Sequence, residues 1–311
     1  MADKMQPFSD RLIEKIRAKD SRCIAGLDPR VDQMPAFART GGICAAITGF
    51  HELVLDTVAD LVPAVKPQLA FFEQYGLAGM QAFENTVRAA RERGLLVIAD
   101  GKRNDISSTA EAYANAYLGG SGFDCDALTA TPYLGRDSLM PFVEACEKHG
   151  KGLFVVLKTS NSGSKDFEDQ PLKATGRPLY EKIAGVLDEL GSGLVGESGY
   201  SAIGAVIGAT FPEEGRRLRA LMPRALILVP GYGAQGGSAK AAAECFNEDG
   251  LGAIVSSSRG ITYASGDPNI SREAFARSVR ENMLRMIDEV NSAVSPANPQ
   301  TPVRSPASLP G

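Results

Sequence analysis

Eight short apolar runs recur along this 311-residue chain, and their character limits the possible fold more than any other feature of the sequence. Within each run the apolar residues follow one another without the polar alternation of a half-exposed strand. We therefore interpret the runs as strands buried on both faces, as in a parallel sheet covered by helices. They occupy residues 23–28, 61–68, 95–100, 125–130, 152–158, 200–208, 225–230 and 251–256.

Helix-compatible segments lie between these runs and carry apolar residues at a spacing of about three to four. The composition does not shift at mid-chain. Eight alternating strand and helix units therefore fit a single α/β domain, a (β/α)8 TIM barrel, better than two doubly wound domains. The predicted helices cover residues 43–59, 77–93, 137–149, 176–190, 212–222, 238–247 and 271–290.

Both ends of the chain extend beyond these units. A helical segment at residues 8–19 precedes the first strand, and we expect it to close the bottom of the barrel. From about residue 292 the sequence turns to Ser, Pro, Ala and Asn, a composition that cannot bury enough apolar surface to fold. We predict a catalytic barrel domain over residues 1–291 and a disordered tail over residues 292–311.

The composition argues against several classes of protein. The formal net charge of −4 gives the surface no general attraction to nucleic acid or to an anionic membrane. Five scattered cysteines and two histidines support neither a disulfide framework nor a zinc site. No apolar run reaches 18 residues, and the first residues lack the apolar core of a signal peptide. The expected location is the cytoplasm.

Charged residues stand where several of the apolar runs end, which is the catalytic edge of a (β/α)8 barrel. Asp100 and Lys102 are two residues apart at the third run, so regular strand geometry would point both toward the barrel axis. Neighbouring carboxylates would keep Lys102 protonated, which suits a proton donor or a group that stabilises negative charge. The alternative is a solvated cluster of surface ion pairs. The other strand-end charges are Asp28, Lys66 and Lys158.

A glycine-rich loop follows the seventh run, at Pro230-Gly-Tyr-Gly-Ala-Gln-Gly-Gly237. It matches G-x-G-x-x-G formally, but that dinucleotide signature belongs to the first unit of a doubly wound sheet. The next run leads into Ser257-Ser-Arg259-Gly260, and the loops after the last two strands form the phosphate site of many barrels. We expect Arg259 to bind a phosphate there, the alternative being that the glycines only form tight turns.

Two further features are less specific. The polar segment from Lys158 to about residue 175 is either a lid that contacts substrate or a solvated insertion. His51 and His149 lie in helical segments far in sequence from the strand ends. We expect them to pack between helices or to face solvent rather than to catalyse.

In this order along the chain, the motifs resemble those of the orotidine 5′-phosphate decarboxylase family, in its longer bacterial subfamily. The resemblance implies a carboxy-lyase that converts orotidine 5′-monophosphate to uridine 5′-monophosphate and CO₂ in pyrimidine biosynthesis, without metal or organic cofactor. Besides the two loops above, the matching stretches are Gly26-Leu-Asp28-Pro29, Lys66-Pro-Gln-Leu-Ala-Phe-Phe-Glu73, Asp100-Gly-Lys102-Arg-Asn-Asp105-Ile-Ser-Ser-Thr109 and Lys158-Thr-Ser-Asn161.

The resemblance also implies a role for each matched residue. Lys102 would stabilise the carbanion at C6 as CO₂ leaves and then protonate it, with Asp100 against the departing carboxylate. Lys66 and Asp105 would complete the charge network. Because Asp105 would reach in from the partner subunit, a homodimer is expected. The implied substrate contacts are Asp28 and Lys66 on one ribose hydroxyl, Asp105 and Thr109 on the other, Ser160 on the pyrimidine, and Gln235, Arg259, Gly233 and Gly260 at the phosphate.

Two positions depart from the family pattern. Ser162 stands where proline is expected, and Asn104 stands where glycine is usual. Neither change removes a charged group, so they concern loop geometry rather than the type of reaction.

Other functions remain open at this stage. A second phosphate-binding barrel lyase, such as a 3-keto-6-phosphogulonate decarboxylase or a hexulose-phosphate synthase, would hold Mg²⁺ with a glutamate after the second strand. This chain has Lys66-Pro-Gln68 there and Glu73 only later. A Schiff-base aldolase acting through Lys102 needs a neutral amine, which flanking carboxylates disfavour. A non-catalytic nucleotide-binding barrel would not need the charge array.

Overall fold

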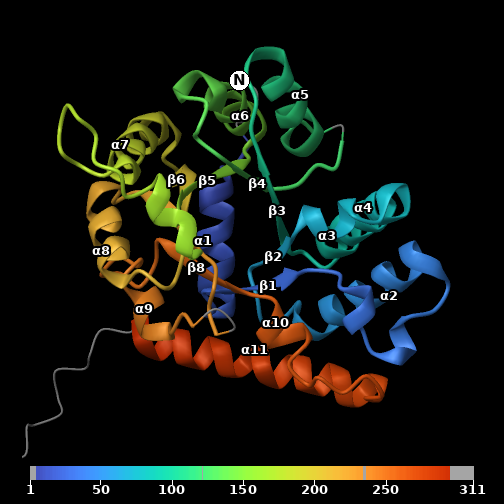
Figure 1. Ribbon diagram of the computed structural model, residues 1–311. Helices are drawn as coiled ribbons and strands as arrows, with labels where there is room; N and C mark the ends of the chain where they lie inside the picture. The colour runs from blue at the N-terminus through green and yellow to red at the C-terminus, as the bar shows by residue number, and fades with distance from the viewer. Residues whose placement is uncertain (1–4, 121, 234–235, 295–311) are drawn as a thin grey trace, which may run out of the picture.

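Eight parallel strands close into a barrel in a computed structural model that describes residues 5–120, 122–233 and 236–294 (Figure 1). The strands follow sequence order around the barrel, and the first pairs with the last. Each lies within or overlaps one of the eight apolar runs, so the predicted (β/α)8 barrel is confirmed. The strands are β1 (Cys23–Leu27), β2 (Ala64–Pro67), β3 (Leu96–Arg103), β4 (Ala127–Ala130), β5 (Gly152–Lys158), β6 (Ser201–Ile207), β7 (Ala225–Val229) and β8 (Ala253–Ser257).

Helices form a layer around the barrel, and apolar side chains fill the space between the two layers (Figure 1). They are α1 (Phe8–Lys19), α2 (Gly42–Val58), α3 (Leu69–Glu73), α4 (Gly76–Glu92), α5 (Ser107–Leu118), α6 (Arg136–His149), α7 (Leu179–Gly191), α8 (Pro212–Leu221), α9 (Ala239–Ala243), α10 (Arg259–Thr262) and α11 (Arg272–Val294). Four short 3-10 helices, at Val31–Gln33, Ala36–Ala38, Ser162–Asp166 and Ser192–Leu194, lie in the connections. No helix of the described residues is long and apolar enough to span a membrane.

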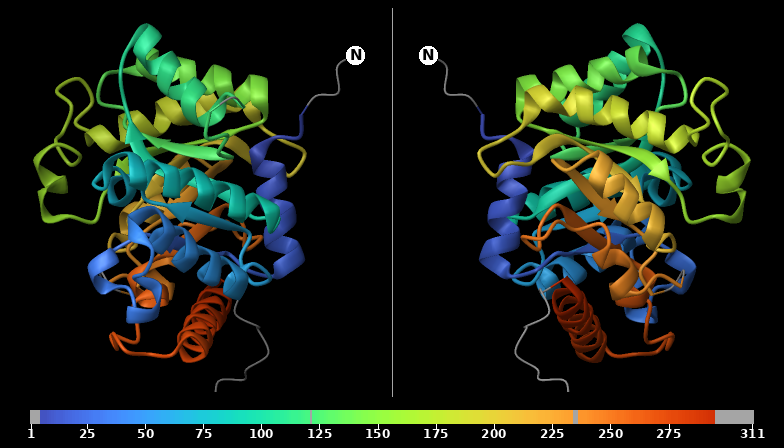
Figure 2. Two further views of the ribbon diagram at one scale, coloured as in Figure 1. Left: turned by 90° about the vertical axis from the view of Figure 1, so that its right-hand side faces the viewer. Right: turned by 90° about the vertical axis from the view of Figure 1, so that its left-hand side faces the viewer.

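The helix α1 closes the end of the barrel at which the strands begin, as expected from the sequence. Its Phe8 ring meets the Phe154 ring edge-on inside the barrel, with the ring centroids 5.9 Å apart. On the same helix Arg11 forms an ion pair with Asp126, which directly precedes β4. Figure 2 shows α1 at one end of the molecule and the segment 159–178 at the other. Because α1 fills this end of the barrel, a functional site is expected at the opposite end, where the strands finish.

Three predicted helix positions need correction. The helix α5 was not predicted, because two of its four buried residues, Ala110 and Ala114, are alanines, which give little apolar contrast. The helix α9 ends at Ala243, short of the predicted residue 247. The helix α11 continues to Val294 and thus includes the first three residues assigned to the tail. The remaining tail residues, 295–311, lie outside the described part of the chain.

His51 packs inside the helical layer, as the sequence predicted for a histidine without a catalytic role. It is 1% exposed, and its ring lies between the rings of Phe50 and Phe72. The Thr86 hydroxyl donates to the Ala82 carbonyl, so His51 Nδ1 carries the proton of the 3.1 Å hydrogen bond to Thr86 Oγ1. Burial lowers the pKa of His51 from 6.5 to about 3.

This lowered pKa predicts an acid-sensitive stability. Between pH 6.5 and 3 the unfolded chain binds a proton on His51 that the folded chain does not. The free energy of unfolding therefore falls with falling pH, approaching about 1.4 kcal/mol per pH unit. Urea denaturation between pH 7 and 5 measures it. In His51→Gln that slope is expected to disappear, and an unchanged slope would contradict the assignment.

Candidate active site

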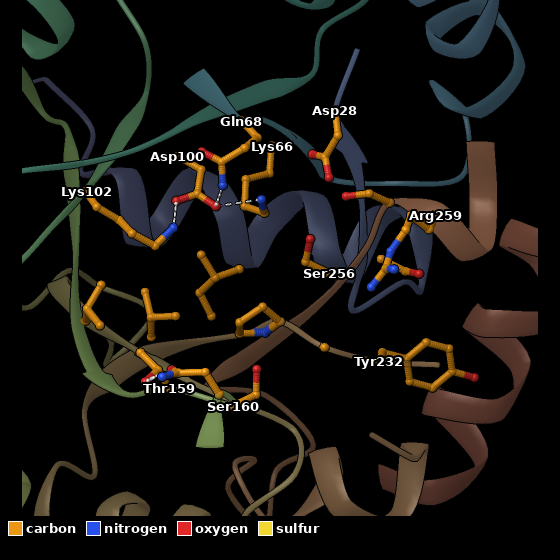
Figure 3. A pocket seen from close by; sticks show the side chains of 18 of the residues that line it. Asp28, Lys66, Gln68, Asp100, Lys102, Thr159, Ser160, Tyr232, Ser256 and Arg259 are labelled. Carbon is orange, nitrogen blue, oxygen red and sulfur yellow. Dashed lines mark hydrogen bonds and ion pairs between the residues drawn. The ribbon is translucent and has the colours of Figure 1, made fainter. Parts of the chain in front are cut away.

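A cavity of about 330 Å³ opens at the end of the barrel opposite α1 (Figure 3). Its walls come from the ends of the strands and the loops that follow them, which is where barrel enzymes carry their chemistry. Apolar side chains from β5, β6 and β7 form one part of the wall, namely Val156, Val206 and Leu228. The polar part includes Asp28, Lys66, Gln68, Asp100, Lys102, Thr159, Ser160, Asn161, Ser256, Ser257, Ser258 and Arg259.

The carboxylate of Asp100 is the hub of this polar wall. Its Oδ2 atom accepts hydrogen bonds from Lys66 Nζ at 2.7 Å and Gln68 Nε2 at 2.9 Å. Its Oδ1 atom accepts from Lys102 Nζ at 2.6 Å and Thr129 Oγ1 at 2.9 Å. Figure 3 shows Lys66 and Lys102 approaching the carboxylate from its two sides. Lys66 and Asp100 therefore form a buried ion pair, and Lys102, whose side chain is 45% exposed, binds the same carboxylate at the edge of the cavity. This arrangement differs from the solvated surface cluster that was the alternative.

Burial and charge act in opposite directions on this cluster. Burial by itself would raise the pKa of Asp100, but the charges of Lys66 and Lys102 outweigh it and hold that pKa well below its usual range. Burial by itself would lower the pKa of Lys66, but the carboxylates of Asp100 and Asp28 outweigh it and raise that pKa. Asp100 is therefore an anion and Lys66 a cation at neutral pH.

Lys102 reaches Asp100 through a bulge and not through the regular strand geometry that the sequence suggested. The pairing of β3 with β4 shifts register between Ala99 and Arg103. Within the shift, Lys102 adopts φ +47°, a left-handed conformation that non-glycine residues rarely occupy. Its backbone N–H donates to Thr129 Oγ1 at 2.9 Å. The prediction that Asp100 and Lys102 meet is right, but the reason given for it is wrong.

Arg259 lies at the other end of the cavity from Lys102 (Figure 3). It lies two residues after the end of β8, and next to it the glycine loop after β7 contributes Pro230, Gly231 and Tyr232 to the wall. Gly231 and Gly233 have φ of +93° and +71°, so this turn needs residues without a Cβ. Gly233 in the glycine loop and Gly260 in α10 do not line the cavity, and Gln235 lies outside the described part of the chain.

Ser160 lines the cavity on the β5 side, where a buried lysine anchors the loop. Lys158 is fully buried, and its Nζ pairs with Asp169 at 2.5 Å and with Glu168 at 3.4 Å. The Glu168 carboxylate also accepts hydrogen bonds from the Thr159 hydroxyl and backbone N–H. These contacts fold the segment after β5 back onto the barrel, beside Ser160. The sequence marked Lys158 as a strand-end charge but gave no sign of this anchoring role.

Asp105 and Thr109 do not line the cavity of their own chain. Asp105 precedes α5, and its Oδ1 atom accepts a hydrogen bond from the neighbouring Ile106 N–H at 2.8 Å. Asn104 donates to Thr131 Oγ1 at 2.6 Å and so ties the loop after β3 to the loop after β4. Large apolar side chains are exposed on these two loops, with exposed fractions of 52% for Ile106 and 79% for Tyr133.

Gln68 and Thr129 contact Asp100 but were not predicted as site residues. Gln68 stands inside the matched Lys66-Pro-Gln motif, so the motif itself could have indicated it. Thr129 is an isolated hydroxyl within an apolar run and carries no local signal.

Comparison with known proteins gives one consistent result. The sequence model of the orotidine 5′-phosphate decarboxylase / HUMPS family matches residues 50–275. The orotidine 5′-phosphate decarboxylase of Rhodopirellula baltica is 44% identical over 95% of this chain and 99% of its own. That of Caldicellulosiruptor saccharolyticus is 40% identical over 94% and 100%. The solved structure of Leishmania donovani OMP decarboxylase superposes with a TM-score of 0.74 at 31% identity, covering 93% of this chain and 99% of that one.

The buried cluster predicts a large loss of stability when its anion is removed. In Asp100→Ala, Lys66 keeps a buried charge without its ion-pair partner, so we expect the free energy of unfolding to fall by about 3–5 kcal/mol at pH 7. Adding Lys66→Met to this variant should recover part of the loss, because the buried charge is then gone. Chemical denaturation of the single and double variants measures both effects.

A matched control lies on the surface. Asp60 and Arg280 form a bidentate pair whose side chains are 59% and 43% exposed. Asp60→Ala is expected to change the free energy of unfolding by less than about 1 kcal/mol. Equal effects of Asp60→Ala and Asp100→Ala would contradict the hub role of Asp100.

Proposed function

The chain belongs to the orotidine 5′-phosphate decarboxylase / HUMPS family, and we propose that it decarboxylates orotidine 5′-monophosphate with Lys102 as the proton donor. The arrangement that best supports these roles is the Asp100 carboxylate between two lysine ammonium groups at one end of the cavity, with Arg259 at the other. The full-length relatives that are orotidine 5′-phosphate decarboxylases favour this function over the sugar-phosphate lyases with the same fold.

The substrate can be oriented from its charges. Its phosphate would bind Arg259 and the backbone of the glycine loop, with Gly233, Gln235 and Gly260 in the same region. Its ribose would contact Asp28 and Lys66. Asp28 Oδ1 is buried and has no hydrogen-bond partner among the described residues, as expected of an acceptor reserved for a ligand hydroxyl. The pyrimidine would lie against Ser160. In this orientation the carboxylate of the pyrimidine would point toward Asp100 and Lys102.

In the reaction, the bond between C6 and the carboxylate carbon breaks, CO₂ leaves, and the electron pair stays on C6. The Lys102 ammonium stabilises this carbanion through its positive charge and then transfers a proton to C6, which gives uridine 5′-monophosphate. Solvent returns the proton to Lys102. Asp100 holds the ammonium in place and places a negative charge beside the carboxylate that departs.

Binding at the phosphate supports this chemistry from a distance. The phosphate end of the substrate does not react. The binding energy of its contacts with Arg259 and the glycine loop can therefore hold C6 against Lys102. Closure of the segment 231–237 over the phosphate would exclude water from the charged groups around Asp100. Their electrostatic interactions with the substrate would then be stronger.

We further propose a homodimer with composite sites, in which Asp105 and Thr109 enter the cavity of the partner subunit. Asp105 lies two residues before α5 and Thr109 lies in its first turn, and neither lines the cavity of its own chain. The loops after β3 and β4 also expose large apolar side chains, Ile106, Tyr133 and Leu134, which contact with a second subunit would bury. The proposed compartment is the cytoplasm, in keeping with five cysteines that are all free thiols.

The central prediction concerns Lys102. Purified protein given orotidine 5′-monophosphate in the presence of EDTA should consume it, measured as a decrease in absorbance of the orotidylate band. Lys102→Ala is expected to lower turnover by several orders of magnitude, because it removes both the charge that stabilises the carbanion and the proton donor. The variant should still bind phosphate ligands, because Arg259 and the glycine loop are unchanged. Near-normal turnover of this variant would exclude the mechanism, and activity lost on chelation would favour the magnesium-dependent lyases.

The composite site makes a separate prediction. Asp100→Ala and Asp105→Ala homodimers should each be nearly inactive. After subunit exchange, each mixed dimer has two sites. One of them carries both substitutions, and the other carries neither and is therefore intact. Mixing equal amounts should therefore restore up to about a quarter of the wild-type activity per subunit, on the assumption of random exchange. Absence of recovery despite demonstrated exchange would contradict the shared site.

A further inference from the structure

Thr129 forms hydrogen bonds with both Asp100 and Lys102 but does not line the cavity. It is the third residue of β4, is fully buried, and is not among the residues that line the cavity. Its Oγ1 atom lies 2.9 Å from Asp100 Oδ1 and 2.9 Å from the backbone nitrogen of Lys102. One hydroxyl therefore joins the side chain of one residue to the main chain of the other.

The direction of both hydrogen bonds follows from chemistry. A backbone N–H can only donate, so the hydroxyl oxygen accepts from Lys102. An ionised carboxylate can only accept, and Asp100 is ionised between two lysines, so the single hydroxyl proton goes to its Oδ1. Both hydrogen-bonding roles of the hydroxyl are thus used, and a side chain without a donor and an acceptor on the same atom cannot replace it.

The bulge in β3 explains why this hydroxyl is needed. Residues 128 and 130 of β4 pair with Ala99 and Arg103, so Thr129 lies opposite the bulged segment that holds Lys102. In the bulge, the Lys102 N–H bonds to the Thr129 side chain. Lys102 keeps its unfavourable φ of +47° at this point, and such conformations persist only where neighbouring contacts hold them.

We propose that Thr129 is a positioning residue that fixes Lys102 and Asp100 relative to each other for proton transfer. The inference rests on the proposed role of Lys102. Since the hydroxyl acts on the main chain of Lys102 and on one oxygen of Asp100, it determines where the ammonium stands at the moment at which the carbanion forms. Thr129 does not line the cavity, so we expect it to affect catalysis and to leave ground-state binding unchanged.

The experiment compares three substitutions at this position. Thr129→Val keeps the shape of the side chain and removes the hydroxyl, whereas Thr129→Ser keeps the hydroxyl. Thr129→Ala differs from Thr129→Ser by one oxygen atom and serves as the matched comparison if the valine variant does not fold. For each, kcat and KM for orotidine 5′-monophosphate and the Kd of uridine 5′-monophosphate are measured, with thermal denaturation as the test of folding.

We expect Thr129→Val and Thr129→Ala to lower kcat by about 10- to 100-fold, the usual effect of losing a hydrogen bond to a charged group in the transition state. KM and the Kd of uridine 5′-monophosphate should change by less than about threefold. Thr129→Ser should retain kcat within about threefold of the wild type.

Three results would overturn the inference. A normal kcat in Thr129→Val or Thr129→Ala would show that the hydroxyl is dispensable. Equal losses in Thr129→Ser and Thr129→Ala would assign the effect to packing. A rise in the Kd of uridine 5′-monophosphate in proportion to the fall in kcat would indicate general disruption of the site.

Lys102→Ala, assayed in the same series, separates this inference from the proposed function. If Lys102→Ala is inactive and Thr129→Val is normal, only the role of Thr129 fails. If Lys102→Ala retains turnover, the proposed mechanism itself fails, whatever Thr129 does.

Discussion

A buried carboxylate between two ammonium groups is the interaction on which the rest of this site depends. An isolated charge inside a protein is strongly unfavourable, and it persists only when hydrogen bonds and opposite charges compensate it fully. Asp100 meets this condition because each of its oxygens accepts two hydrogen bonds. The four donors come from β2, the residue after it, β3 and β4, so the cluster forms only when these strand ends lie side by side.

The barrel provides that arrangement by separating packing from chemistry. At one end α1 seals the interior, where Phe8 packs on Phe154 and the inward side chains are apolar. At the other end the strand termini carry charged and polar groups around the cavity. A rigid floor matters to the site because side chains at the strand ends are held within tenths of an ångström only if the strands beneath them cannot shift. Lys158 extends this principle to a loop, since its buried charge fixes Glu168 and Asp169.

Much of this could be predicted from particular residues. Continuous apolar runs such as Gly152–Lys158 identify buried parallel strands, because a strand covered on both faces needs no polar alternation. Charges directly after such runs predict the catalytic edge, and Asp100, Lys102 and Arg259 were found there. The helix α5 was not predicted, because buried alanines do not produce a clear apolar stripe in the sequence. The bulge at Lys102 was not predicted, because it depends on the register between β3 and β4, which the local sequence pattern does not indicate.

The sequence by itself thus determined the strands, their order as repeating units, and the residue types at their ends. Those properties follow from local periodicity and composition, which a chain carries before it folds. Only the tertiary structure decided which groups meet. Thr129 is 27 residues from Lys102 along the chain and becomes its partner through the register of two strands, and a shift of one residue would turn the hydroxyl to the other face. Hydrogen bonds act over about 3 Å, so their partners are settled by packing in space and not by neighbourhood in sequence.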